Sequence, residues 1–240
     1  MSAPRVLIGY SRDARTRDAF ERAGCDAWTC DLLPREDGNN KHIQADIWQA
    51  LREPWDFAVL HPMCTYLTVS AAWAYKDPDY TRWPGVGYHQ RVKPGTLTGA
   101  DRRKAQEEAV RNFCALMALP FPVVAENPAP SFLNTTLYPP YQVVQPYQFG
   151  DDASKSTGLW WNRAAHDAHI PTLKPTRQVP GRLVRGKRGV LMRWGNQTDS
   201  GQNRVSPSDT RWLERSATYP GIADAMGTQW GAYLAAGAQS

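Results

Sequence analysis

The opening of the chain most constrains its fold, because it alternates strand, helix and strand. Residues 5–10 form an apolar run that ends at Gly9. Residues 16–23 contain good helix formers and stop at Gly24, which is typical of a glycine C-cap. Residues 27–30 form a second short strand-like run. A strand, a helix and a strand within roughly 30 residues predict a βαβ unit, and hence an α/β protein with a parallel sheet.

Further apolar and amphipathic runs extend this α/β pattern. Residues 57–60 and 123–125 are short, fully apolar runs, typical of strands that are buried in a parallel sheet. Residues 100–117 form the clearest predicted helix, with few helix breakers. Its apolar face carries Ala109, Phe113, Leu116 and Met117. We therefore expect a mostly parallel sheet with helices on both faces.

Less regular segments complete the chain. Residues 65–100 are rich in aromatic residues, glycine and proline, which predicts a long mobile loop. Its aromatic side chains would pack the loop down or stack on bases. The remaining predicted elements are a helix at 46–52, a β pair within 141–161, a helix that starts with Ser206 as N-cap and Pro207, and a helix at 223–235.

The composition is that of an ordinary globular protein. Of 240 residues, 42% are hydrophobic and 21% are charged, which suits one sizeable core or a core with a small lobe. No apolar run approaches the roughly 18 residues that span a bilayer, and the N-terminus lacks signal-peptide features. We expect a cytoplasmic protein with no membrane partner. The four cysteines show no Cys-x-x-Cys spacing, which argues against a metal site and a disulfide framework.

Positive charge is concentrated towards the C-terminus. Residues 171–215 contain ten Lys or Arg against three acidic residues, a net charge of +7, whereas the remainder has 18 basic and 20 acidic residues, a net charge of −2. This pattern predicts a polyanionic partner such as DNA, and a solvated mobile loop is the simpler alternative. The candidate phosphate-binding residues are Lys155, Arg182, Arg185, Lys187, Arg188 and Arg193.

Two predicted strands end in residues that can do chemistry. Residues 57–60 are soon followed by Cys64, a candidate nucleophile. Residues 123–125 run directly into Glu126 and Asn127. Because ligands bind where the carboxyl ends of parallel strands meet, a thiol and a carboxylate would converge there, with Glu126 as a candidate general acid. The simpler alternatives are a cysteine that fills a loop and a glutamate that caps or forms an ion pair.

The first turn of the βαβ unit departs from the glycine-rich pattern of phosphate-binding loops. Residues 11–15 read Ser-Arg-Asp-Ala-Arg, which disfavours a pyrophosphate cofactor. A cofactor without phosphates, such as S-adenosylmethionine, tolerates this departure better. Asp31 follows the second strand and would accept hydrogen bonds from ribose hydroxyls or stabilise its own turn. Asp46 would cap a helix or contact an adenine ring.

Taken in order, these features resemble the DNA cytosine-5 methyltransferases, particularly the short forms of bacteriophages and prophages. The similarity extends from Val6 to about Trp230. The matching segments are Ala19-Phe20-Glu21-Arg22-Ala23-Gly24 in the first cofactor motif, Asp31 at the ribose position, Asp46-Ile47 at the adenine position, Pro62-Met63-Cys64 for the Pro-Pro-Cys motif, Glu126-Asn127-Pro128 for the Glu-Asn-Val motif, and Gly221 to Trp230 for the last motif. The nearest counterpart of the Gln-x-Arg-x-Arg motif lies between Gln145 and Lys155.

The resemblance implies a Rossmann-like class I methyltransferase fold and transfer of a methyl group from S-adenosylmethionine to C5 of cytosine in DNA, through a covalent Cys64–C6 adduct. Glu126, with a pKa raised in a desolvated pocket, would hold the charge that develops on N3. Asn127 would orient the glutamate or the loop. The implied cofactor-binding residues are Gly9, Tyr10, Ser11, Asp31, Leu32, Asp46, Ile47 and Pro62. The implied parts are a catalytic domain (1–162), a small basic recognition segment (163–205) and C-terminal helices that return to the catalytic domain (206–240).

Other readings stay open at this point. The short recognition segment also suits a free nucleotide, RNA or single-stranded DNA as acceptor. A modified sulfonium donor that carries an extra carboxylate would suit Arg12 or Arg15. A non-catalytic nucleic-acid-binding relic would keep the fold and the basic segment. A phage-encoded enzyme would act in the host cytoplasm.

Overall fold

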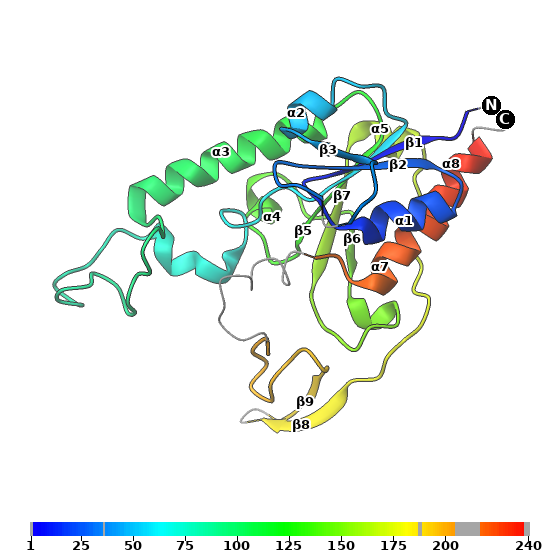
Figure 1. The fold of residues 1–240 in the computed structure, drawn as a ribbon. Coiled ribbons are helices and arrows are strands. Elements are labelled where there is room, and N and C mark those ends of the chain that lie inside the picture. The colour runs from blue at the N-terminus through cyan, green and yellow to red at the C-terminus, as the bar shows by residue number, and fades with distance from the viewer. Residues whose placement is uncertain (1, 36, 187–188, 205–216, 238–240) are drawn as a thin grey trace.

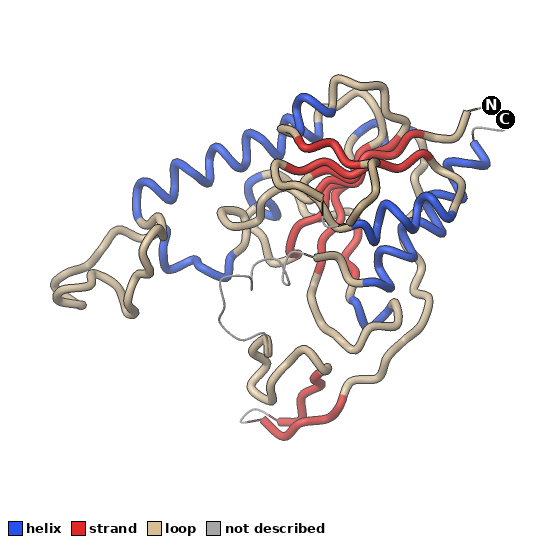
Figure 2. Tube along the Cα trace, in the orientation of Figure 1, coloured by secondary structure: helices blue, strands red, loops and turns tan. Residues whose placement is uncertain are grey.

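A seven-stranded mixed β-sheet forms the centre of the molecule (Figures 1 and 2). The computed structural model describes residues 2–35, 37–186, 189–204 and 217–237. The strand order is β3-β2-β1-β4-β5-β7-β6. Strand β7 runs in the direction opposite to the other six strands. The strands are β1 (Arg5–Gly9), β2 (Asp26–Asp31), β3 (His42–Gln44), β4 (Phe57–Leu60), β5 (Val123–Pro128), β6 (Gln142–Val144) and β7 (Thr157–Trp161). The prediction of a mostly parallel α/β sheet is confirmed.

Helices cover both faces of the sheet, also as predicted (Figure 2). Successive residues of a strand point to opposite faces. Val6 and Ile8 therefore join one core cluster with Trp230, while Leu7 joins the opposite cluster with Leu116. The helices are α1 (Ala14–Arg22), α2 (Ile47–Ala50), α3 (Gly99–Met117), α4 (Leu133–Thr136), α5 (Arg163–Asp167), α7 (Pro220–Ala225) and α8 (Ala232–Gly237), with 3₁₀ helices η1 (Val69–Tyr75) and η2 (Pro146–Gln148) and a π-helical segment η3 (Met226–Gly231).

The C-terminal helices pack against α1. The predicted helix at 223–235 is one continuous run of α7, η3 and α8. Gly227 is required there, because a Cβ atom on it would lie 2.3 Å from the backbone carbon of Ala19. The absence of a side chain lets η3 approach α1 closely enough to close this face of the core. The predicted helix that starts at Ser206 and Pro207 lies outside the described residues.

Strand β5 continues beyond its apolar run. The apolar run ends at Ala125, and β4 ends opposite it at Leu60. The strand nevertheless continues through Pro128, because the antiparallel strand β7 pairs with it as far as Pro128 and Thr157. Glu126 and Asn127 are therefore part of β5, which ends in Glu126-Asn127-Pro128 as expected.

The loop over residues 65–100 is organised near the sheet by one buried arginine of α3. The guanidinium group of Arg102 donates a hydrogen bond of 2.9 Å to the carbonyl oxygen of Thr65 and lies 5.3 Å and 4.7 Å from the ring centres of Tyr66 and Tyr75. The Tyr75 hydroxyl in turn donates to the carbonyl oxygen of Tyr66 at 2.7 Å. These aromatic side chains pack the loop down, whereas residues 77–98 extend beyond α3 (Figure 1).

The basic segment contains a two-stranded antiparallel hairpin, which the sequence did not predict. Strands β8 (Arg182–Gly186) and β9 (Gly189–Arg193) form a separate sheet that stands away from the main one (Figure 1). The Trp194 ring beyond β9 stacks on Tyr147 with ring centres 4.1 Å apart, which attaches the hairpin to the main body. Residues 163–173 contribute to the main core through Ala165, Ile170 and Leu173, so the part that stands apart begins well after residue 163.

Two findings on the described residues concern membrane and metal binding. Among the described residues, none of the helices combines the length and apolar character needed to cross a membrane. In the same part of the chain, no group of three or more His, Cys, Asp or Glu side chains could hold a metal ion.

One buried asparagine ties the start of β5 to the end of β7. The side chain of Asn162 is 1% exposed. Its Oδ1 accepts hydrogen bonds from the backbone N–H groups of Val123 at 3.0 Å and Ala165 at 2.8 Å. Its Nδ2 donates to the carbonyl oxygens of Leu119 at 3.0 Å and Phe121 at 2.9 Å. All four hydrogen-bonding positions of this amide are therefore used.

Replacing Asn162 with alanine should lower the free energy of unfolding by about 3 kcal/mol, because buried backbone groups would lose their partners. Urea denaturation would measure this change. Arg163→Ala, at the next residue, removes only an exposed ion pair with Asp167 and should leave stability essentially unchanged. Equal stability of the Asn162 variant and the wild type would contradict this account of the β5–β7 connection.

Candidate active site

The topological switch point of the sheet lies between the carboxyl ends of β1 and β4. From β1 the chain adds β2 and β3 on one side, and then β4 and β5 on the other. Strand β1 pairs with β2 on one side and with β4 on the other. Ligands of open α/β sheets bind at such a switch point. The backbone N–H of His61 donates to the carbonyl oxygen of Gly9 at 3.0 Å, so the segment that leads to Cys64 starts there. Gly9 is needed for packing, because a Cβ atom would lie 2.5 Å from Leu60 and 2.6 Å from Ile47.

Hydrogen bonds fix the loop that carries Cys64. Nδ2 of the buried Asn127 donates to the carbonyl oxygen of Pro62 at 2.9 Å, which joins the loop to β5. The carbonyl oxygen of Cys64 accepts bonds from the backbone N–H groups of Leu67 and Thr68, both at 2.9 Å. Cys64 is partly exposed. The loop thus presents a thiol from a defined backbone position.

Glu126 lies beside His61 at this edge of the sheet. Its Oε2 is 3.5 Å from Nδ1 of His61, and the two side chains are 15% and 11% exposed. Burial raises the pKa of Glu126, but the charge of Lys155 and hydrogen bonds from His61 and Thr157 outweigh burial and lower that pKa overall. The expectation of a raised pKa is therefore wrong for this structure, because the predicted desolvation is present but positive charge surrounds the carboxylate.

Two buried polar atoms of this cluster make no hydrogen bond with the described residues. They are Oδ1 of Asn127 and Nε2 of His61. Buried polar atoms are normally paired, so unpaired ones at a strand edge mark places for a ligand group. His61 was missed by the sequence reasoning. The available signal was its position directly after an apolar strand and three residues before the candidate nucleophile.

The residues expected to hold the cofactor follow the ends of β1, β2 and β3. Tyr10 adopts a positive φ of 58°, and its hydroxyl accepts a hydrogen bond of 3.2 Å from Asn112. Burial raises the pKa of that hydroxyl. The backbone N–H of Ser11 donates to the carbonyl oxygen of Cys30 at 3.0 Å, which turns the chain back across β2. Together these contacts build a rigid turn between β1 and α1.

The two candidate carboxylates also have local structural roles. Asp31 accepts a hydrogen bond of 2.9 Å from the backbone N–H of Leu33, and Asp46 caps α2 by accepting from Trp48 at 2.9 Å. The turn and cap alternatives are thus observed. Leu32 is 69% exposed, whereas Ile47 is 4% exposed and belongs to the core. Ile47 is therefore a packing residue, and Leu32 is accessible next to Asp31.

A buried arginine shapes the loop after β2. The side chain of Arg17, which is 2% exposed, lies 2.6 Å from Asp18 and 2.5 Å from Asp37. The pKa of Asp37 is lowered chiefly by its hydrogen bond from Arg17. This pair fastens the loop between β2 and β3 to α1. Sequence reasoning did not single out any of these three residues.

Three of the candidate DNA-binding residues, Arg182, Arg185 and Arg193, lie on the β8–β9 hairpin, and Lys155 lies elsewhere. Lys155 precedes β7, and its charge acts on Glu126 rather than on the hairpin. Arg182 lies 2.6 Å from Asp199, and Arg193 donates to the carbonyl oxygen of that aspartate at 3.2 Å. Both arginines thus brace the turn after β9. Arg185 is exposed on β8. Lys187 and Arg188 lie outside the described residues.

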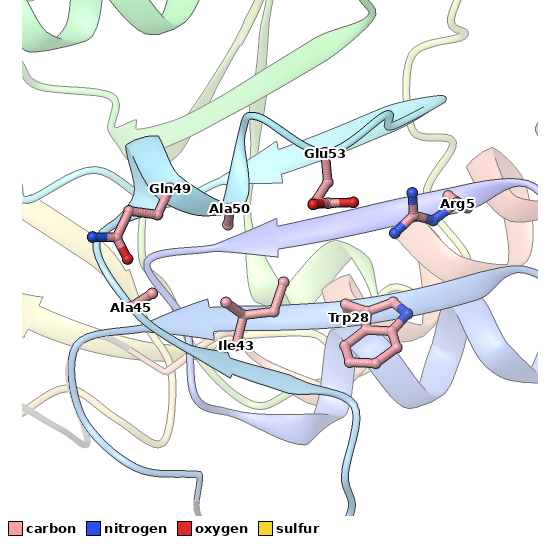
Figure 3. Close-up of a pocket in the computed structure, with 7 residues that line it drawn as sticks. All are labelled: Arg5, Trp28, Ile43, Ala45, Gln49, Ala50 and Glu53. Carbon is pink, nitrogen blue, oxygen red and sulfur yellow. The ribbon is translucent and has the colours of Figure 1, made fainter.

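A separate hollow of about 370 Å³ lies beside α2 (Figure 3). Its lining residues are Arg5, Trp28, Ile43, Ala45, Gln49, Ala50 and Glu53. None of the predicted catalytic residues is among them.

The fold and this edge define an α/β protein with a Rossmann-like sheet and a thiol, a carboxylate and an imidazole at its switch point. The sequence matches no known protein-family model and no curated protein to a significant degree. The functional argument therefore depends on the geometry of this edge.

The lowered pKa of Glu126 makes stability depend on pH. A carboxylate whose folded-state pKa lies below its ordinary value of 4.5 contributes stability above that value and loses it as the pH falls through the folded-state pKa. Glu126→Gln should therefore be less stable than the wild type at pH 7, and the difference should shrink below pH 4.5. Urea unfolding across this range would measure it. The exposed Glu108, changed to glutamine, is the control and should show no such trend.

Proposed function

We propose that this protein catalyses S-adenosylmethionine-dependent transfer of a methyl group to C5 of cytosine in DNA, through a covalent bond between Cys64 and C6. The observation that supports the proposal is the hydrogen bond that ties the loop ahead of Cys64 to β5, the strand that also carries Glu126. The Cys64 loop is tied to β5 through Asn127 and Pro62, and Glu126 lies on the same strand as Asn127. The order of motifs along the sequence supports the same reaction.

The reaction needs a nucleophile because C5 of cytosine is itself weakly reactive. Addition of the Cys64 thiolate at C6 converts the ring into an enamine and moves negative charge towards N3 and O2. Cysteine suits this step, since a thiolate is strongly nucleophilic. After transfer, loss of the C5 proton and elimination release Cys64 unchanged.

Glu126 is suited to respond to the charge on N3. Without a ligand, nearby positive charge keeps its pKa low. A base that fills the site displaces water and disfavours the charged carboxylate, so Glu126 would then share a proton with N3. Asn127 keeps the loop and the carboxylate in register through its bond to Pro62.

The turn after β1 fits a cofactor that has no pyrophosphate. Residues 11–15 lack glycines, and Asp13 caps α1 by accepting a hydrogen bond of 3.0 Å from the backbone N–H of Arg15. The carboxylates of Asp31 and Asp46 would hold the ribose and the adenine of S-adenosylmethionine. When bound, that cofactor supplies the methyl group.

The hairpin β8–β9 would contact DNA. Arg185 is exposed on it, beside the exposed apolar side chains of Leu183 and Val190. A two-stranded ribbon has the width to enter a groove of DNA. Because the target base must leave the duplex before it reaches Cys64, contacts at the hairpin would hold the flanking DNA while the base is flipped.

Cys64→Ser should lower methyl transfer about a thousandfold or more, because a serine hydroxyl does not supply the thiolate. Titration calorimetry with S-adenosylmethionine should show unchanged binding. Cys114→Ser changes an exposed cysteine of α3 and should keep wild-type transfer. Mass spectrometry of nucleosides from DNA recovered after expression gives the readout, 5-methylcytosine, and would also reveal a larger transferred group. Substantial turnover by the serine variant would remove Cys64 from the mechanism.

Arg185→Ala should weaken DNA binding at low salt and reduce the slope of log affinity against log salt by about one. The reason is the loss of one phosphate contact. Arg163→Ala removes an equally exposed arginine from α5, distant from the hairpin in sequence, and serves as the charge-matched control. Fluorescence anisotropy at several salt concentrations measures both. An unchanged slope for Arg185→Ala would place the DNA elsewhere.

A further inference from the structure

We propose that His61 is the base that takes the proton of the Cys64 thiol, with Glu126 orienting its imidazole ring. This inference deepens the proposed function and rests on it for the identity of the nucleophile. It begins from two observations: the contact between Nδ1 of His61 and Oε2 of Glu126 at 3.5 Å, and the buried Nε2 that makes no hydrogen bond with any described residue.

The state of Glu126 decides which ring nitrogen of His61 carries the proton. Positive charge and hydrogen bonds lower the pKa of Glu126 despite its burial, so its carboxylate is ionised at neutral pH and can only accept. Nδ1 of His61 is therefore the donor. In the neutral imidazole, Nε2 is then an acceptor. A carboxylate that fixes the tautomer in this way leaves the other nitrogen ready to receive a proton.

The contact of 3.5 Å is long for a hydrogen bond. Catalytic hydrogen bonds are often long before a ligand enters and shorten when the ligand excludes water. The buried Nε2 is the stronger argument for the pair, because a buried acceptor without a donor lowers the stability of the folded protein. In the proposed pair, the thiol of Cys64 supplies the donor that Nε2 lacks.

Chain length limits how far Cys64 can lie from this acceptor. Three peptide units separate the Cα atoms of His61 and Cys64 and span at most about 11 Å. The bond from Asn127 to the Pro62 carbonyl holds the middle of this segment against β5. His61, Cys64 and Glu126 are thereby kept at one edge of the sheet.

The proton transfer is balanced in atoms and charge. The S–H bond of Cys64 breaks, an N–H bond forms at Nε2 of His61, and no group is oxidised or reduced. Glu126 from β5 faces the imidazole, and the charge of Lys155 ahead of β7 acts on Glu126. With a neutral thiol and imidazole, Glu126 and Lys155 sum to zero. With a thiolate and an imidazolium, the four groups again sum to zero.

Alkylation of the full-length protein by iodoacetamide tests the pair without a methyl donor or DNA. Peptide mass spectrometry gives the rate at each cysteine between pH 5 and pH 9. We expect the Cys64 profile to have its midpoint below the value of about 8.5 that is typical of a thiol. His61→Gln should raise that midpoint by about one pH unit and slow alkylation at neutral pH about tenfold.

Controls separate this effect from unfolding and from failure of the proposed function. Cys114 is exposed on α3, and its profile should be the same in all variants. Glu126→Gln should raise the Cys64 midpoint less than His61→Gln does. If His61→Gln unfolds, His61→Asn keeps a donor near the Nδ1 position and should give the same shift. An unchanged Cys64 profile in the folded His61 variant overturns the pair, even if methyl transfer is found. A shifted profile in a protein that transfers no methyl group supports the pair and rejects the methyltransferase function.

Discussion

The parallel pairing of β4 with β5 is the contact on which the candidate site depends. Its register sets Leu60 opposite Ala125, so the next residues along the two strands, His61 and Glu126, become neighbours. The register is specific because the paired residues, 58–60 and 123–125, are apolar and fully buried, and a slip by one residue would turn every side chain to the other face. The site geometry is therefore a consequence of core packing.

The antiparallel strand β7 adds what a purely parallel sheet could not. Because β7 runs opposite to β5, its first residue, Thr157, lies beside the last residue of β5, Pro128. The segment just before β7 brings Lys155 to the same edge as Glu126. Positive charge from one side and the imidazole of His61 from the other then hold the carboxylate ionised, although burial alone would favour the protonated form. The fold thus tunes one carboxylate of β5 with residues at the ends of its two neighbouring strands, β4 and β7.

Sequence patterns predicted the parts of this structure that local physics determines. The strands at 5–9 and 57–60 and the helix at 100–117 were found because continuous apolar runs and long stretches without helix breakers specify their own conformation. Strand β3 was missed because His42–Gln44 is short and polar and forms a strand through its pairing with β2. The continuation of β5 as far as Pro128 likewise depends on a partner about thirty residues further along the chain.

The same division applies to the site. The sequence could suggest that Cys64 and Glu126 meet, because strand ends of a parallel sheet share an edge. It could not suggest that His61 lies next to Glu126, because that requires the register between strands 65 residues apart. Nor could the sequence give the direction in which the pKa of Glu126 shifts, since the charge that lowers it belongs to Lys155, just before β7. Three residues before the thiol lies an imidazole that faces the carboxylate of Glu126. The proposal that His61 takes the proton of Cys64 depends on this arrangement.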